Sequence, residues 1–166
     1  MKSRLTSWCV FGVSTSVLIA LDLLLKQWAA ANLMGQPPRV LVPGFLGLTY
    51  HENPGAAFGF LAGAAQGRVF LTIFSILLMA AILAYYHILP NEKRFLFLRI
   101  PLILIFAGGT GNLIDRITLG AVRDMLAFLF INFPIFNLAD VYVTAGAFSF
   151  VFAVLLVVKD APLFNA

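Results

Sequence analysis

The sequence predicts an all-α membrane protein that crosses a bilayer four times. Of its 166 residues, 61% are hydrophobic and 11% are charged, whereas soluble globular domains are about 45–50% apolar and about 25% charged. The apolar residues also gather in long stretches, and a helix that crosses a hydrocarbon core of about 30 Å needs about 20 of them. The length of the chain suits a single domain over residues 1–166.

Four stretches of the chain are long and apolar enough to span a membrane. Asp22 interrupts the first stretch near its end, glycines cluster near the end of the third, and Asp140 opens the fourth. A further apolar run, Met125–Phe136, has only 12 residues and contains Pro134, so we expect an interfacial or re-entrant segment there. The predicted spans are residues 8–25, 69–89, 95–114 and 138–158.

The first stretch has a rival interpretation as a secretory signal peptide. Lys2 and Arg4 supply a basic start, and Ala29–Ala31 resembles a small-residue cleavage site. The apolar run is too long for a signal peptide, however, and Asp22 interrupts its end. The sequence therefore favours a retained span.

Residues 35–68, between the first two predicted helices, are rich in glycine and proline. Within them, residues 40–50 have the pattern of short strands punctuated by turns. We expect a small sheet lying on the membrane surface.

The basic residues indicate the orientation. With four spans, both termini lie on one side, and Lys93 and Arg94 fall in a very short loop on that side. The cations of the other side are spread over two long loops, and basic residues are enriched in short cytoplasmic loops, so we expect cytoplasmic termini. The net charge of +4 comes from cations scattered at the ends of apolar runs, which argues against nucleic acid as a partner.

Five of the seven acidic residues are predicted to lie on the outer side. A charged residue at the centre of a span costs about 2.5–3.5 kcal/mol on insertion scales, so acids at membrane depth are expected only where they have a structural or functional role. Asp22 and Lys26 are spaced i,i+4 and can form an ion pair that positions the first helix. Asp115 is followed by Arg116, which would hold it ionised in a structural or binding role. The five acids are Asp22, Glu52, Asp115, Asp124 and Asp140.

Asp124 and Asp140 form the candidate catalytic pair. If the apolar segment between them loops out and returns, the two carboxyls meet at the membrane surface. Two close carboxyls share one proton because both cannot ionise cheaply. One can then draw a proton from water while the other protonates a peptide carbonyl. The alternatives are that these aspartates cap helices or pair with Arg116, or that Asp115 takes the place of Asp124.

Metal and nucleophile chemistry have little support in the sequence. His51 and His87 are predicted on opposite sides of the membrane, so they cannot share a zinc ion. The outer loops hold no serine for a triad with His51. We therefore expect neither a metal nor a cofactor. Gly108–Gly111 lacks the ending of a phosphate loop and instead suits close helix packing.

Two non-enzymatic interpretations compete with the peptidase. A proton-conducting or substrate-binding membrane subunit would also carry acids at membrane depth, but conduction predicts acids spread from side to side. A helix-packing scaffold explains Gly108–Gly111 but not the aspartates.

Four blocks follow one another along the chain: Asp22-x-x-x-Lys26, then Asn53-Pro54-Gly55-Ala56-Ala57-Phe58, then Gly108-Gly109-Thr110-Gly111-Asn112-Leu113-Ile114-Asp115-Arg116 with Val122-Arg123-Asp124, and finally Phe136-Asn137-Leu138-Ala139-Asp140. As an ordered set they resemble the lipoprotein signal peptidases, also called signal peptidase II. The similarity covers nearly the whole chain.

The resemblance implies a bacterial cytoplasmic-membrane enzyme with four helices, cytoplasmic termini and a small extracytoplasmic β-cradle between helices 1 and 2. It implies Asp124 and Asp140 as the catalytic pair near the outer face. The implied substrate is a diacylglyceryl-modified prolipoprotein, cut just before the lipidated cysteine, and we expect a monomer in contact with membrane phospholipid. The residues that match the family's blocks, and that are expected to bind substrate or support the site, are Asp22, Lys26, Asn53, Gly55, Gly108, Asn112, Asp115, Arg116, Asn137 and Ala139.

Two positions depart from the family's pattern. The family commonly has Val-Val-Asp-Phe where this chain has Val122-Arg123-Asp124-Met125, and it usually has Ser where this chain has Val141. In an extended segment Arg123 would point away from the face that Asp124 uses. If Arg123 pointed inward, it would hold Asp124 ionised. Neither departure removes a carboxylate.

Overall fold

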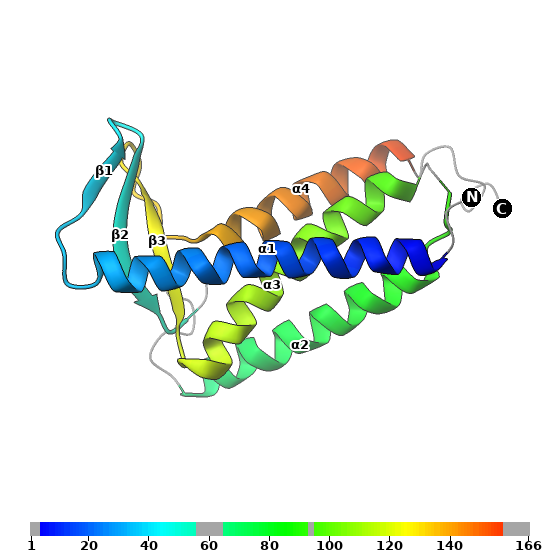
Figure 1. The fold of residues 1–166 in the computed structure, drawn as a ribbon, viewed down its shortest axis with the longest axis horizontal. Coiled ribbons are helices and arrows are strands. Elements are labelled where there is room, and N and C mark those ends of the chain that lie inside the picture. The colour runs from blue at the N-terminus through cyan, green and yellow to red at the C-terminus, as the bar shows by residue number, and fades with distance from the viewer. Residues whose placement is uncertain (1–3, 56–64, 93–94, 158–166) are drawn as a thin grey trace.

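In the computed structural model, four long helices lie side by side and a three-stranded sheet closes one end of them (Figure 1). The structure describes residues 4–55, 65–92 and 95–157. Several sequence predictions fall outside the described residues, namely those on Lys2, Ala56–Phe58, Lys93 and Arg94, and the end of the fourth span at residue 158.

The helices are α1 (Arg4–Leu33), α2 (Ala65–Ile88), α3 (Leu96–Thr118) and α4 (Leu138–Val157). All four are long and apolar enough to cross a membrane, which confirms the prediction of four long apolar helices. The largest difference is in α1, whose 30 residues run well beyond residue 25. The helix can continue past Asp22 because the carboxylate pairs with Lys26 on the same face, and both side chains are fully buried. Ala29, in the alternative cleavage site, is also buried within this helix.

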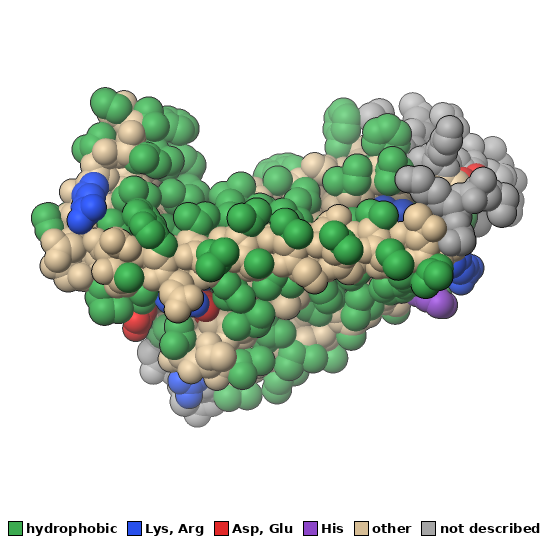
Figure 2. All heavy atoms as spheres, viewed as in Figure 1, with side chains coloured by type: hydrophobic (Ala, Val, Ile, Leu, Met, Phe, Trp, Pro, Cys, Tyr) green, Lys and Arg blue, Asp and Glu red, His purple; other side chains and the backbone are tan. Residues whose placement is uncertain are grey.

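α3 lies at the centre of the helices. Half of the residues in its most apolar 18-residue stretch are buried, against 17% in the corresponding stretch of each of the other three helices. The outer faces of α2 and α4 instead expose large apolar side chains such as Phe70, Phe74, Phe148 and Phe152. Figure 2 shows apolar side chains along the whole length of the helices, with charged ones near the two ends. This distribution is the one that a lipid solvent selects.

The sheet contains β1 (Arg39–Val42), β2 (Leu46–Asn53) and β3 (Val122–Phe128) in the antiparallel order β1-β2-β3. Gly44 turns the chain between β1 and β2 with a φ of 67°, which a side chain would disfavour. The predicted sheet between the first two helices is therefore confirmed, and a third strand from the connection between α3 and α4 joins it.

The segment Met125–Phe136, predicted to be interfacial or re-entrant, does not span the helices but begins as a strand. Residues 125–128 belong to β3 and pair with β2. The chain then turns, and Phe136 returns to bridge Leu126. The segment is apolar because it packs phenylalanine rings on one another, as in the contact of Phe128 with Phe136 at 4.9 Å between ring centroids. This return places the start of α4 beside β3.

Candidate active site

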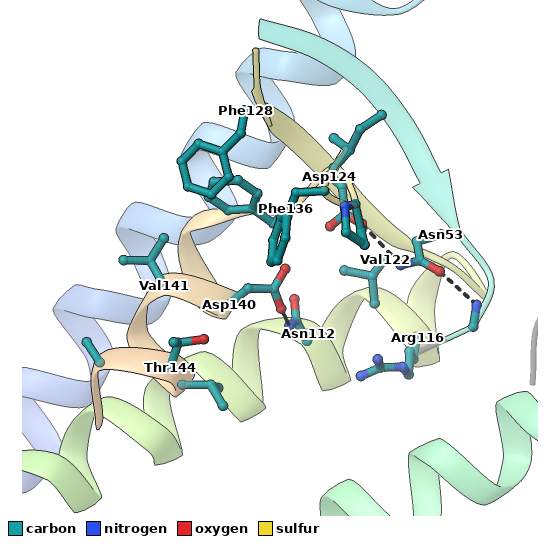
Figure 3. Close-up of a pocket in the computed structure, with 16 residues that line it drawn as sticks. Asn53, Asn112, Arg116, Val122, Asp124, Phe128, Phe136, Asp140, Val141 and Thr144 are labelled. Carbon is teal, nitrogen blue, oxygen red and sulfur yellow. Dashed lines mark hydrogen bonds between the residues drawn. The ribbon is translucent and has the colours of Figure 1, made fainter. Parts of the chain in front are cut away.

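A cavity of about 540 Å³ lies between β3, the end of α3 and the start of α4, and two carboxyl groups face it (Figure 3). Asp124 comes from β3, and Asp140 comes from the first turn of α4. The other polar residues of the wall are Asn53, Asn112 and Arg116, and Gly55 also lines it. The rest of the wall is largely apolar and includes Phe128, Phe133, Pro134, Ile135, Phe136, Val141 and Val143. The cavity thus combines two acids and one cation with a surface suited to apolar chains.

Asn137 connects the two carboxyls. Its side-chain Nδ2 donates to Asp124 Oδ1 at 2.6 Å, and its backbone N donates to Asp140 Oδ2 at 3.1 Å. Its Oδ1 accepts from the backbone N of Asp140 at 2.9 Å, so Asn137 also caps α4. A single fully buried residue therefore fixes the positions of both acids.

Asn112 holds Asp140 from the side of α3. Its Nδ2 donates to Asp140 Oδ1 at 2.8 Å, while its Oδ1 accepts from Lys26 Nζ at 2.8 Å and from Asn137 Nδ2 at 3.1 Å. Because an amide carries both donors and an acceptor, Asn112 can join a cation on one side to a carboxylate on the other.

Asn53 holds Asp124 from the side of β2. Its Nδ2 donates to Asp124 Oδ2 at 3.2 Å, and its Oδ1 accepts from the backbone N of Gly55 at 3.0 Å. The dashed lines in Figure 3 follow both bonds. The turn after β2 thereby keeps the amide oriented toward the carboxyl.

Asp22 and Lys26 form the predicted ion pair, with Nζ 2.8 Å from Oδ2. The other oxygen of Asp22, Oδ1, accepts from the backbone N of Ala139 at 2.9 Å. This bond lies at the N-terminus of α4, where a carboxylate also interacts favourably with the helix dipole. The pair supports the site from behind the cavity.

Asp115 has different partners from the one predicted. Arg123 Nη2 lies 2.6 Å from its Oδ1, and Lys26 Nζ lies 3.6 Å from its Oδ2. Arg116, the neighbour in sequence, instead lines the cavity, because adjacent residues of a helix point in different directions. Asp115 is fully buried and is not among the described residues that line the cavity.

The glycine cluster of α3 allows close helix packing, as predicted. A Cβ atom at Gly108 would meet the carbonyl oxygen of Ala139, and one at Gly111 would meet the carboxylate of Asp22. The helices can therefore approach closely enough for Asn112 to reach Asp140.

Burial and the negative charge of Asp140 raise the pKa of Asp124 to about 7, although hydrogen bonds from Asn137 and Asn53 oppose the shift. A carboxyl with this pKa holds a proton near neutral pH and can release it. Burial is the larger of the two causes, and the contribution of Asp140 is the one expected when two close carboxyls share one proton.

The structure gathers all of the predicted site residues at the sheet end of the helices. Asn53, Gly55, Asn112, Arg116, Asp124 and Asp140 line the cavity, and Asp22, Lys26, Gly108, Asp115, Asn137 and Ala139 lie behind it. Sequence reasoning missed the apolar wall from Phe128 and residues 133–136, and the pairing of Arg123 with Asp115. The apolar run was visible in the sequence, but only its return to β3 brings it to the cavity.

Comparisons with known proteins agree with this arrangement. The family profile described as Signal peptidase (SPase) II matches residues 14–156. The chain is 41% identical to a lipoprotein signal peptidase of Streptococcus thermophilus, over 81% of this chain and 84% of that one. It is 36% identical to one of Streptococcus pyogenes, over 88% and 90%.

The fold is also similar to solved structures. One, described as a bacterial membrane enzyme, superposes with a TM-score of 0.78 at 28% identity, over 92% of this chain and 91% of that one. A second has a TM-score of 0.77 at 30% identity, over 89% and 93%. The chain therefore belongs to the signal peptidase II family, and it is an aspartic peptidase of a bacterial membrane that removes the signal peptides of prolipoproteins.

Proposed function

We propose that Asp124 and Asp140 carry out the hydrolysis and that the substrate is a diacylglyceryl-modified prolipoprotein, cut just before its lipidated cysteine. The observation that carries this proposal is the cavity itself, where both carboxyls face an apolar wall. The wall suits acyl chains and the apolar part of a signal peptide, and the acids supply the chemistry for the peptide bond.

The reaction follows from one proton shared by the pair. Asp124, with its raised pKa, carries the proton and donates it to the scissile carbonyl oxygen. Asp140 takes a proton from water, whose oxygen attacks the carbonyl carbon. The tetrahedral diol then collapses: the C–N bond breaks, the leaving amine takes the proton from Asp140, and Asp124 recovers its proton from a diol hydroxyl. Both acids return to their starting states without a covalent intermediate.

The surrounding residues fix the geometry of these transfers. Asn137, Asn112 and Asn53 hold the two carboxyls through the bonds described above, so neither acid has to reorient during reaction. Arg116 also lines the cavity and balances the single negative charge of the pair.

The same proposal includes the setting in the membrane. Arg4 begins α1 and Val157 ends α4, and both lie at the end of the helices opposite the sheet (Figure 1). We propose that this end is cytoplasmic, that the cavity lies near the outer face, and that the chain works as a single-domain monomer among phospholipids. The weak bias of basic residues toward the side of the termini supports this orientation.

The substrate class can be tested with two matched prolipoproteins. We expect the protein, reconstituted in phospholipid vesicles, to cleave a diacylglyceryl-modified prolipoprotein and to leave the same chain with Ser in place of that cysteine intact. Mass spectrometry should find the lipidated cysteine at the new N-terminus, and a chelator should leave the rate unchanged. Equal cleavage of both chains would contradict the proposed substrate, and inhibition by the chelator would contradict a metal-free pair.

The pH dependence follows from the pKa of Asp124. Above about pH 7 the pair loses its shared proton, so we expect kcat/KM to fall with an apparent pKa near 7. The Asn53→Ala variant should move this fall to higher pH, because the bond from Asn53 lowers the pKa of Asp124. A rate that stays constant to about pH 9 in the wild-type protein would contradict the assignment.

The same group makes stability depend on pH. The native protein keeps a proton on Asp124 between its ordinary pKa of 3.8 and about 7, whereas the unfolded chain has lost it. The contribution of Asp124 to the free energy of unfolding therefore decreases as pH rises through this window.

A further inference from the structure

Arg123 stands directly before Asp124 on β3, yet its side chain lies on the other face of the strand. It donates three hydrogen bonds to the carboxylate of Asp115. Nη2 binds Oδ1 at 2.6 Å, Nε binds Oδ2 at 3.2 Å, and the backbone N binds Oδ2 at 3.1 Å. A paired guanidinium contact of this kind fixes direction as well as distance. These bonds hold the start of β3 against the end of α3.

The same contact completes a buried cluster of four charges. Lys26 Nζ lies 3.6 Å from Asp115 Oδ2 and 2.8 Å from Asp22 Oδ2. The side chains of these three residues are fully buried, and that of Arg123 is 15% exposed. Two acids and two cations give no net charge. Without Arg123, a single lysine would face two buried carboxylates, which leaves one charge uncompensated.

This cluster holds both segments that carry the catalytic acids. Lys26 binds Asn112, which in turn binds Asp140 Oδ1 at 2.8 Å. On the other side, the backbone of Arg123 is held one residue before Asp124. The position of one carboxyl relative to the other therefore depends on the cluster.

We propose that Arg123 is a positioning residue of this peptidase. By binding Asp115 it holds β3 against the end of α3, which positions Asp124, and it keeps the buried cluster of four charges neutral. The inference rests on the proposed catalytic roles of Asp124 and Asp140. Arg123 is not among the described residues that line the cavity, so it acts through Asp124 and not on the substrate.

Loss of Arg123 should affect turnover more than substrate binding. A shift of about 1 Å in a catalytic group can cost about 10²-fold in rate, so we expect Arg123→Met to lower kcat by about 10- to 100-fold with KM nearly unchanged. The uncompensated negative charge should also move the alkaline fall in rate to higher pH. Other charged and titratable groups lie on the elements around Asp124 and form the background for this shift in pH dependence. They are Asp140 from α4, Arg116 and Asp115 from α3, Asp22 and Lys26 from α1, and His51 and Glu52 from β2.

A set of variants separates position from charge. Arg123→Lys keeps the charge but cannot form the paired contact, so it should keep the wild-type pH dependence and recover only part of kcat. The double variant Asp115→Asn with Arg123→Met makes the cluster neutral again, so the pH dependence should return while kcat stays low. Arg39→Met is the control, because Arg39 is an exposed cation of β1 outside the cluster, and it should behave as wild type.

The experiment is a measurement of kcat, KM and the pH dependence for each variant in vesicles, with thermal unfolding to establish that each is folded. Wild-type kcat and pH dependence in folded Arg123→Met would overturn the inference, as would a loss of stability alone. Should Arg123→Met fail to fold, Arg123→Lys decides: wild-type kcat there overturns the inference. The Asp124→Asn variant separates a failure of the proposed catalytic roles from a failure of this inference. An active Asp124→Asn protein would overturn the proposed function itself. An inactive Asp124→Asn protein together with a normal Arg123→Met protein would overturn only the role of Arg123.

Discussion

Asp124→Asn and Asp140→Asn should each lower the rate of prolipoprotein cleavage by on the order of 10³-fold or more, because general acid and base catalysis each contribute about 10²–10⁴-fold. An amide has the shape of the carboxyl but cannot exchange the proton that the pair shares. The oxygen of each new amide can still accept one of the bonds that hold the carboxyl, from Asn137 or Asn53 at position 124 and from Asn112 or the backbone N of Asn137 at position 140. We therefore expect both variants to remain folded in membranes, as measured by thermal unfolding of the purified protein.

Two acid-to-amide controls make this result specific. Glu52→Gln changes an exposed acid on the same sheet, whose carboxylate accepts a bond from Tyr50, and it should leave the rate close to wild type. Asp115→Asn tests the alternative pair. Complete loss of activity in Asp115→Asn together with an active Asp124→Asn would assign the catalytic role to Asp115, and near-normal turnover by Asp140→Asn would exclude the pair altogether.

Gly108→Ala should lower the rate by about 10²-fold without changing any polar group, since a misplacement of about 1 Å is enough for such a loss. The added Cβ would meet the carbonyl oxygen of Ala139 and would lie 2.9 Å from Cγ2 of Val143. The first of these is backbone in the opening turn of α4, so the helix must move away from α3. Asp140 is the next residue and must move with it. Overpacking of this kind typically also costs about 1–3 kcal/mol of stability.

Gly12→Ala is the matched control for that variant. Gly12 lies in the interior of α1, and no atom lies within 4 Å of the Cβ that it would gain. Alanine is the better helix former by about 1 kcal/mol, so Gly12→Ala should keep full activity and lose no stability. A Gly108→Ala protein with wild-type kcat would show that contact between α3 and α4 does not set the position of Asp140.

The sequence predicted the features that depend on length and local spacing. The four spans follow from the extent of the apolar stretches, and each is present as a helix. The pairing of Asp22 with Lys26 follows from their i,i+4 spacing. The close packing at Gly108 follows from the absence of side chains in a helix that must pack on others.

Features that depend on distant segments were not predictable in the same way. β3 pairs with β2 across about seventy residues of chain, as in the register of Asn53 with Val122. No local sequence pattern predicts that pairing. Asp115 was expected beside Arg116, yet its partner is Arg123. The chain reverses at Gly120, whose φ is 80°, and this turn brings Arg123 back to the end of α3.

The choice between Asp115 and Asp124 shows what structure adds to a pattern. Two grounds favoured Asp124 in the sequence, namely the position of Arg116 beside Asp115 and the family resemblance. In the structure Asp115 is enclosed by Arg123 and Lys26, whereas Asp124 faces the cavity with Asp140. The proposed roles now rest on a physical difference between two buried aspartates.

The most direct test of the shared-proton pair is the affinity of a lipidated peptide in which a hydroxyl-bearing tetrahedral carbon replaces the scissile carbonyl. Such a group imitates the diol between the two carboxyls, and transition-state analogues bind at least about 10²-fold more tightly than substrates. The account predicts tight binding to the wild-type protein and a loss of about 10²-fold or more in both Asp124→Asn and Asp140→Asn. Equal affinity of the three proteins for this peptide would contradict it.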